Sequence, residues 1–189
     1  PGGRADWPPT RFSQETLDAI RRNGDRFAPF EFDFLVATTQ SQQEELKHNL
    51  QHFPSPSFSH DGYRFPMLCP GQSFTEEFHR LRDLQVWEEA GVDAMYYDIS
   101  ANNLIRLCVR DDHEHAPGGG KALNDGYRHI FATTGAALSQ AAGERIPLGT
   151  EMYNEVFLDR LAFYQARAWA QPASALEAWP FLGDLTTGQ

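Results

Sequence analysis

Apolar residues recur at two different spacings along the chain, and segments of the two kinds alternate. Phe30, Phe32 and Phe34 occupy every second position after Pro29, which is the pattern of a strand with one buried face. Residues 73–91 instead repeat apolar side chains every three or four positions, which is the spacing of one helix face. We expect this face to pack on the core, and its members are Phe74, Phe78, Leu81, Leu84 and Trp87.

The same signals divide the rest of the chain. Helices are predicted at residues 13–26, 42–52, 73–91, 125–145 and 157–170, with a short helix or cap in the tail. Strands are predicted near residues 27–36, 64–68, 92–98 and 146–151. Ser13 is a start signal for the first helix and Gly24 a stop signal, and Ser73 with Glu76 forms a capping box for the helix at 73–91.

Strands that alternate with helices of this length predict a parallel α/β fold. Four to five strand–helix units can be counted, whereas a complete (β/α)8 barrel usually needs about 250 residues. The expected fold class is therefore α/β, a partial TIM barrel of the (β/α)8 type, in a single domain or fragment of one over residues 1–189. No Gly-x-Gly-x-x-Gly motif follows a strand and no Walker loop occurs, so no nucleotide or other cofactor is predicted.

The composition and net charge of the chain argue against some classes of binding partner. The chain has 189 residues, of which 41% are hydrophobic, enough to bury a substantial core. A formal net charge of −10 argues against nucleic acid and acidic membranes as partners, and no apolar run is long enough for a transmembrane helix. The chain begins without Met and without a signal peptide, so we expect a processed or excised piece. The remainder of a larger polypeptide, or a second copy of the chain, is then an expected partner.

Two carboxylates fall where a parallel fold places catalytic groups. Asp98 ends the buried run at 92–98, and Glu151 ends the run at 146–151. Carboxyl ends of successive parallel strands meet at one crevice. Such a pair suits glycoside hydrolysis, in which one carboxylate attacks or stabilises the anomeric carbon and the other, protonated, serves the leaving oxygen. The alternative is that Asp98 caps the following turn and Glu151 is a solvated rim residue.

Three blocks of sequence resemble a known family. The first block contains "MLCPG", "FTEEFHRL" and "EEAGVDAMYYD" in this order. The second block is "LCVRDDHEHAPGGG", and the third is "TEMYNEVFLD". In this order they resemble a mostly bacterial family of glycoside-hydrolase-like TIM barrels with a His-Gly-His-Pro-Pro-Gly-Gly-Gly turn, over roughly residues 63–165. That family is distantly similar to the α-amylase superfamily and to endo-α-N-acetylgalactosaminidases. Ala94, Glu114 and Met152 stand where the family usually has glycine, and the last two put the substrate range in doubt.

The resemblance implies a role for each carboxylate. By it, Asp98 is the nucleophile and Glu151 the general acid/base of a retaining glycosidase that acts on an oligosaccharide or glycoconjugate. Two alternatives stay open. One is a non-catalytic partial barrel that only binds carbohydrate or a protein partner, and the other is a metal-dependent hydrolase.

The turn before the glycines supplies further candidates. His113 and His115 flank Glu114 and would project to one side, where neutral imidazoles suit sugar hydroxyls. Gly119, between two other glycines, would let the backbone approach a ligand. The alternatives are a charged surface loop, or a metal held by His113, His115 and Asp98. No further histidine stands at ligand spacing, and Cys69 and Cys108 lack metal-type spacing, so no metal is predicted.

Three more residues are expected at the sugar site. Tyr96 and Tyr97 alternate faces of one strand, so one faces the crevice and one the core, and Tyr97 is assigned to the substrate. Glu155 could bind substrate or orient Glu151, or it is an acid favoured at a helix N-terminus. Asp33 lies in a predicted strand and is either a sugar-binding acid or a satisfied core acid.

Overall fold

A parallel sheet of four strands forms the centre of the protein in this computed structural model, which describes residues 13–32, 34–35, 46–51, 58–60, 63–98, 107–151 and 154–165. The strands are β1 (Phe30–Phe32), β4 (Met95–Asp98), β5 (Leu148–Glu151) and β6 (Phe163–Gln165). Their spatial order is β1-β4-β5-β6, and each neighbouring pair is parallel. The prediction of parallel strands is confirmed for the segments at 27–36, 92–98 and 146–151.

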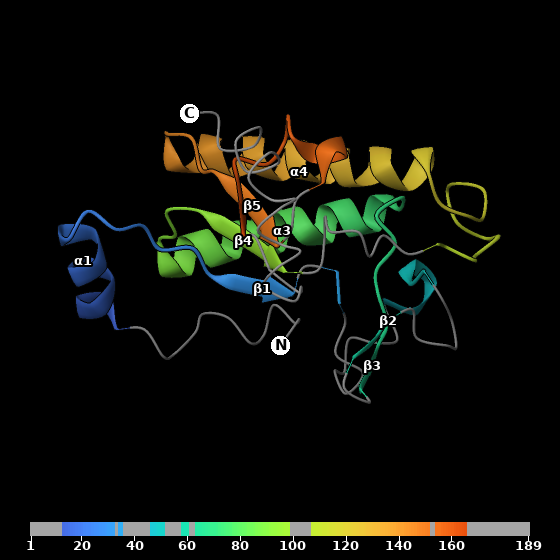
Figure 1. Ribbon diagram of the computed structural model, residues 1–189, viewed down its shortest axis with the longest axis horizontal. Helices are drawn as coiled ribbons and strands as arrows, with labels where there is room; N and C mark the ends of the chain where they lie inside the picture. The colour runs from blue at the N-terminus through green and yellow to red at the C-terminus, as the bar shows by residue number, and fades with distance from the viewer. Residues whose placement is uncertain are drawn as a thin grey trace, which may run out of the picture.

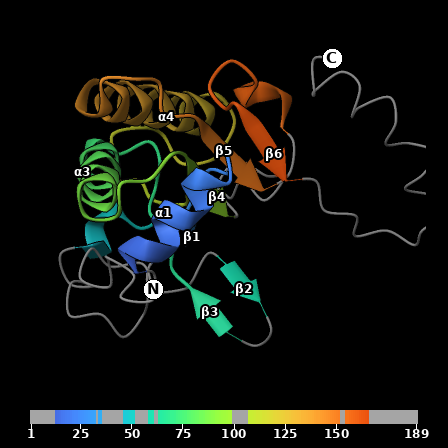
Figure 2. The ribbon, with the colours of Figure 1, turned by 90° about the vertical axis from the view of Figure 1, so that its left-hand side faces the viewer.

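Two long helices cover one face of this sheet. They are α3 (Ser73–Ala90) and α4 (Lys121–Ala142), which lie side by side (Figures 1 and 2). The shorter α1 (Gln14–Arg22) begins as predicted, because the Ser13 side chain accepts a hydrogen bond from the Thr16 amide. None of the helices in the described ranges is both long and apolar enough to cross a membrane.

Two predicted elements are wrong. The segment near 64–68 is not a strand of the parallel sheet, because β2 (Phe58–His60) and β3 (Tyr63–Phe65) form a separate antiparallel hairpin (Figure 2). The described part of the predicted helix at 157–170 is not an α-helix, because residues 155–165 form the 3-10 helix η3 (Glu155–Phe157), a turn and the strand β6. Of the predicted helix at 42–52, the described part holds the 3-10 helix η2 (Lys47–Asn49). The predicted tail helix lies outside the described residues.

The side of α3 that faces the core also differs from the prediction. Its buried side chains are Thr75, His79, Arg82, Asp83 and Val86. The predicted apolar face is only half-buried and packs along the edge of the core. The predicted capping box is absent as well, because the N-cap is Gln72, whose side chain makes no cap hydrogen bond. Ser73 instead bonds Glu114, with 2.7 Å from its hydroxyl to Oε1 and 3.2 Å from its amide to Oε2.

The two faces of the sheet have different characters. Tyr97 and Leu148 pack against α3 and α4, since the Tyr97 ring stacks on Phe131 and Leu148 lies beside Gly135. Side chains alternate along a strand, so Tyr96 and Asp98 point to the opposite face, together with positions 149 and 151 of β5. On that face Phe30, Tyr96 and Phe163 form a row of rings, with centroid distances of 5.6 and 6.4 Å.

Candidate functional site

Asp98 and Glu151 end adjacent strands in matching positions. Tyr97 pairs with Thr150 in the register of β4 and β5, and the two acids are the next residue on each strand. Both strands run in the same direction, so both acids lie at the carboxyl-end edge of the sheet. They are almost fully buried, with exposed fractions of 4% for Asp98 and 3% for Glu151. Because their side chains leave the face opposite α3 and α4, the two carboxylates project from the same side of the sheet.

A layer of aromatic rings lies one step below the acids. Tyr96 and Gly149 stand two residues before Asp98 and Glu151 in the same register, and Gly149 is paired with Phe163. A side chain at Gly149 would overlap the Phe163 ring, so the missing Cβ is what lets this ring reach across β5 to Tyr96. The Tyr96 hydroxyl donates to Gln165 of β6, which pairs with Glu151. Layers of inward side chains are the packing mode of parallel barrels.

Tyr97 does not share this face. It is fully buried, its hydroxyl donates to Asp83 Oδ2 at 2.6 Å, and its ring packs on α4. The sequence assigns Tyr97 to the substrate, but the structure places Tyr96, and not Tyr97, on the side of the acids. Asp83 Oδ1 in turn lies 2.7 Å from Arg82 Nη2, and this Nη2 lies 3.0 Å from Oε2 of Glu31 in β1. Tyr97 thus belongs to a buried polar network that fastens α3 to β1 and β4.

The other predicted residues fall in several places. Asp33 lies outside the described residues. Glu155 is exposed in the first turn of η3, where an acid is favourable to the helix end. Gly119 lies beside Leu107, within a turn whose flanking residues Gly118 and Gly120 have φ of 127° and 71°. Positive φ at both flanking positions explains the run of glycines as a tight turn into α4.

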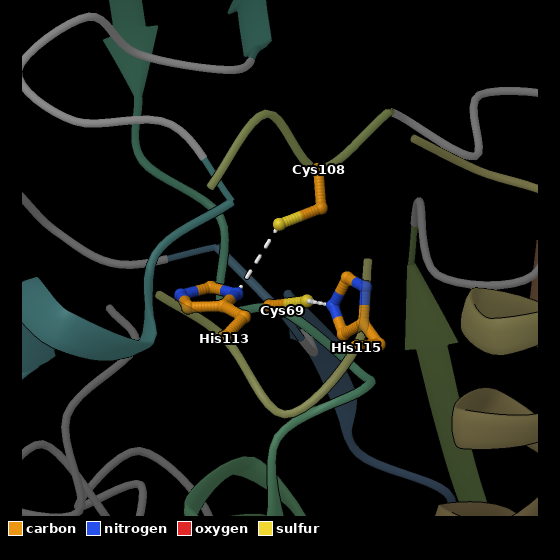
Figure 3. Close-up of side chains that lie close together, drawn as sticks. All are labelled: Cys69, Cys108, His113 and His115. Atoms are coloured by element: carbon orange, nitrogen blue, oxygen red, sulfur yellow. Dashed lines mark hydrogen bonds between the residues drawn. The ribbon is translucent and has the colours of Figure 1, made fainter. Parts of the chain in front are cut away.

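His113 and His115 form a compact cluster with the two cysteines (Figure 3). His115 Nε2 lies 3.0 Å from Cys69 Sγ, and His113 Nδ1 lies 3.2 Å from Cys108 Sγ. One ligand-type atom from each of the four residues lies within 4.8 Å of every other. The sequence pattern suggests only His113, His115 and Asp98 as a set of metal ligands, because Cys69 and Cys108 lack metal-type spacing. Folding brings them together, and both thiols are free and buried.

The second nitrogen of each imidazole is also engaged. His113 Nε2 lies 2.8 Å from the His48 carbonyl oxygen, and His115 Nδ1 lies 2.8 Å from that of Ala116. All four ring nitrogens therefore have partners within the protein, and the role of these histidines in binding sugar hydroxyls stays a prediction. Burial lowers the pKa of His113, so its neutral form is favoured. Burial likewise raises the pKa of the Cys69 thiol.

One local signal for this cluster was present in the sequence. Cys108 precedes His113 by five residues and His115 by seven, so three of the four side chains come from one short segment. Cys69 stands 39 residues before Cys108, just ahead of α3. Local spacing therefore identifies three members, and the fold supplies the fourth.

Solved structures with a similar fold are glycoside hydrolases. The α-N-acetylgalactosaminidase NagBb from Bifidobacterium bifidum, in complex with GalNAc, matches with a TM-score of 0.59 and 15% identity over 82% of this chain. The α-galactosidase TtGalA from Thermus thermophilus matches with a TM-score of 0.55 and 19% identity over 96%. The GH36 α-galactosidase AgaA from Geobacillus stearothermophilus matches with a TM-score of 0.57 and 10% identity over 86%.

These likenesses concern the fold and part of each enzyme. The chain spans 24% of NagBb, 36% of TtGalA and 23% of AgaA. A search of curated proteins by sequence finds no match. One protein-family model, described as a domain of unknown function (DUF6259), matches residues 32–181. Because that match covers more than half of a chain with a glycoside-hydrolase-like α/β fold, the protein belongs to the DUF6259 family.

Proposed function

We propose that this chain carries the two catalytic carboxylates of a retaining glycosidase, with Asp98 as the nucleophile and Glu151 as the general acid/base. One observation carries the proposal. The two acids occupy matching positions at the carboxyl ends of adjacent parallel strands, both are buried, and both leave the face that α3 and α4 do not cover. In this proposal the sheet is part of a (β/α)8 barrel whose interior face holds the acids.

The register supports a retaining rather than an inverting mechanism. Neighbouring strands lie about 4.8 Å apart, so the backbones of two residues at matching positions are separated by about that distance. Retaining pairs need about 5–5.5 Å between carboxyl groups, whereas inverting pairs need about 6.5–9.5 Å to admit a water molecule. Acids on one register row of adjacent strands therefore suit direct attack on the sugar better than attack by an intervening water.

The proposed reaction has two steps. In the first, Asp98 attacks the anomeric carbon while Glu151 protonates the glycosidic oxygen, so the bond to the leaving group breaks and a glycosyl ester forms on Asp98. In the second, Glu151 takes a proton from water, and the resulting oxygen attacks the anomeric carbon and releases Asp98. Phe30, Tyr96 and Phe163 beneath the acids supply an apolar floor on which a sugar ring could rest.

The substrate class is proposed from the structural likeness. NagBb is an α-N-acetylgalactosaminidase, and TtGalA and AgaA are α-galactosidases. We therefore propose an α-linked galactose or N-acetylgalactosamine at the end of an oligosaccharide or glycoconjugate as the substrate of this protein. The face of the sheet with an aromatic layer below two acids is compatible with a small sugar ring.

The test uses the full-length protein and aryl α-glycosides of galactose and N-acetylgalactosamine. Asp98→Gly should abolish turnover, and added azide should restore release of the aryl group while giving a glycosyl azide of inverted configuration. Glu151→Ala should lose most activity on poor leaving groups, and azide should then give a product of retained configuration. These opposite stereochemical outcomes assign the two roles, because azide replaces the nucleophile in one variant and the water in the other.

Glu144→Gln is the matched control, since Glu144 is an exposed acid just after the C-terminal end of α4, at the edge of the sheet opposite the two carboxylates. It should keep wild-type kinetics within about twofold, as expected for a group outside the chemistry. Full activity in Asp98→Gly or Glu151→Ala would refute the catalytic assignment. A wild-type protein that binds these sugars in calorimetry without hydrolysing them would support the non-catalytic carbohydrate-binding alternative instead.

A further inference from the structure

The four side chains around the turn at 108–115 have the composition of a metal site. Their atoms are two cysteine sulfurs, His113 Nδ1 and His115 Nε2, all within 4.8 Å of one another. Figure 3 shows Cys69, Cys108, His113 and His115 pointing toward a common centre. In a tetrahedral zinc site with bonds of about 2.0–2.3 Å, ligand atoms stand about 3.3–3.8 Å apart. The observed sulfur–nitrogen distances of 3.0 and 3.2 Å are close to that spacing.

The outer hydrogen bonds prepare both imidazoles for a metal. A carbonyl oxygen can only accept a hydrogen bond, so His113 Nε2 and His115 Nδ1 must carry the ring protons that reach His48 and Ala116. The nitrogens that face the sulfurs then present bare lone pairs. A metal-bound histidine commonly donates its other N–H to a backbone carbonyl or a carboxylate in this way, which fixes the tautomer and the ring orientation.

Packing around the cluster also keeps its centre tight. A Cβ at Gly71 would lie 2.5 Å from His115 Cδ2, so only glycine lets the Cys69–Gly71 turn approach this ring. Both thiols have no exposed surface. Cys69, Cys108 and Leu123 form a buried cluster separate from the main core. The segment from Leu107 to Gly120 has no helix and one bridge, between Cys108 and Gly118, so its order depends largely on side-chain contacts such as those of the four residues.

We propose that Cys69, Cys108, His113 and His115 bind one Zn²⁺ ion in a structural site. Two thiolates and two imidazoles in tetrahedral arrangement are a preferred ligand set of zinc. Four protein ligands leave no open coordination position, so the ion does not activate water, and the metal-dependent hydrolase suggested as an alternative from the sequence is not the role of this site. Neither Asp98 nor Glu151 is a ligand, so the proposal stands independently of the glycosidase mechanism.

The position of the site indicates what the ion would stabilise. Cys69 lies in the connection that leads into α3, and the other three ligands lie in the connection from β4 to α4. Helices between parallel strands run opposite to them, so both connections lie at the edge where Asp98 and Glu151 stand. The ion would cross-link the starts of α3 and α4. A cross-link between distant chain segments stabilises the folded state by restricting the unfolded one.

The first test measures the metal directly. The full-length protein, made without a polyhistidine tag and with zinc in the medium, should contain about one zinc ion per chain by mass spectrometry of metals. X-ray absorption at the zinc edge should then show two sulfur neighbours at about 2.3 Å and two nitrogen neighbours at about 2.0–2.1 Å. Replacement by Co²⁺ should give the visible absorption of tetrahedral cobalt and a near-ultraviolet sulfur-to-cobalt band.

Variants identify the ligands. Cys69→Ser and His115→Ala should each lower zinc content at least about tenfold, since the loss even of an outer hydrogen-bond partner of a ligand typically costs about 10–100-fold in metal affinity. His48→Ala is the matched control, because its side chain is exposed and only its backbone carbonyl contacts His113. It should retain the full zinc content. A strong chelator should lower the melting temperature of the wild type and leave that of Cys69→Ser unchanged.

Several results would overturn the proposal. One is wild-type protein with no stoichiometric metal after zinc supplementation. Another is zinc bound with only oxygen and nitrogen neighbours, which would place it elsewhere. A third is a Cys69–Cys108 disulfide in freshly purified protein, detected by mass spectrometry of a non-reduced digest, since oxidised sulfurs cannot serve as thiolate ligands. The wild-type absorption spectrum decides the matter even if a variant fails to fold.

Discussion

Arg82 is a buried cation in a polar network between α3 and the sheet, and its removal should cost far more stability than removal of a surface arginine does. Its guanidinium lies 3.0 Å from Glu31 Oε2 and 2.7 Å from Asp83 Oδ1. Arg82, Glu31 and Asp83 are all buried, with exposed fractions of 5% or less. Arg82→Met keeps most of the aliphatic volume but removes the charge, so two buried carboxylates lose their cation.

The expected magnitude follows from that burial. Breaking a buried ion pair by removing one partner costs about 3–5 kcal/mol, a large share of the roughly 5–15 kcal/mol that stabilises a typical domain. For a domain of 150–250 residues, this corresponds to a fall in melting temperature of about 6–20 °C. The measurement is urea unfolding of Arg82→Met and wild type, followed by fluorescence. The dependence of the unfolding free energy on urea concentration should be the same for both proteins.

Arg80→Met is the matched control on the same helix. Arg80 is partly exposed, and its pair with Glu77 at 3.4 Å is a surface ion pair, so its loss should cost about 0–1 kcal/mol. Adding Glu31→Gln to Arg82→Met should recover part of the lost stability, because it removes one of the stranded carboxylates. If Arg82→Met is no less stable than Arg80→Met, the buried network does not hold α3 on the sheet.

Three further predictions concern other parts of the described chain. Gly149→Ala should cost about 1–3 kcal/mol by overpacking against Phe163, measured by urea unfolding, and adding Phe163→Leu should relieve it. Glu114→Gln should weaken the start of α3 by about 0.3–1 kcal/mol, the worth of a charge at a helix N-terminus, read from faster amide exchange at residues 73–76. The Arg128 guanidinium lowers the pKa of Asp159 below its usual value of 3.8. Their pair should therefore stabilise the protein above pH 4 or so and lose this effect as the pH falls through and below the unfolded-state value near 3.9. Asp159→Asn should accordingly be less stable than wild type at neutral pH and approach it in acid denaturation curves.

Local signals predicted the elements whose own residues carry the pattern of a helix or a strand. The Ser13 cap and the apolar spacing of residues 13–26 gave α1, and the alternating phenylalanines gave β1. The strand β6 was missed because Phe157, Leu161 and Tyr164 repeat at helical spacing. Pairing with β5 overrides that spacing, since strand formation depends on the neighbouring strand more than on the segment itself.

The buried side of α3 was missed for a related reason. Apolar periodicity selects Phe74, Phe78 and Leu81, and it has no means of scoring Arg82 or Asp83 as core residues. These polar side chains are buried because Glu31 and Tyr97 meet them from other parts of the chain. A buried charge is stable only when its partners are in place, and sequence periodicity does not show partners that lie 14 or 51 residues away.

The two proposed sites share one segment of chain, which makes their tests informative about each other. Asp98 ends β4, and Cys108 with both histidines follows in the same connection before α4. Asp98→Asn should leave the zinc content unchanged, because Asp98 is not a ligand. Chelation should lower glycosidase activity of the wild type without removing either carboxylate, because the starts of α3 and α4, at the edge of the sheet where Asp98 lies, would lose their cross-link. If chelation removes the zinc and leaves activity intact, the ion stabilises the two helix starts without positioning Asp98. If the protein holds zinc but hydrolyses no glycoside, the glycosidase proposal alone fails.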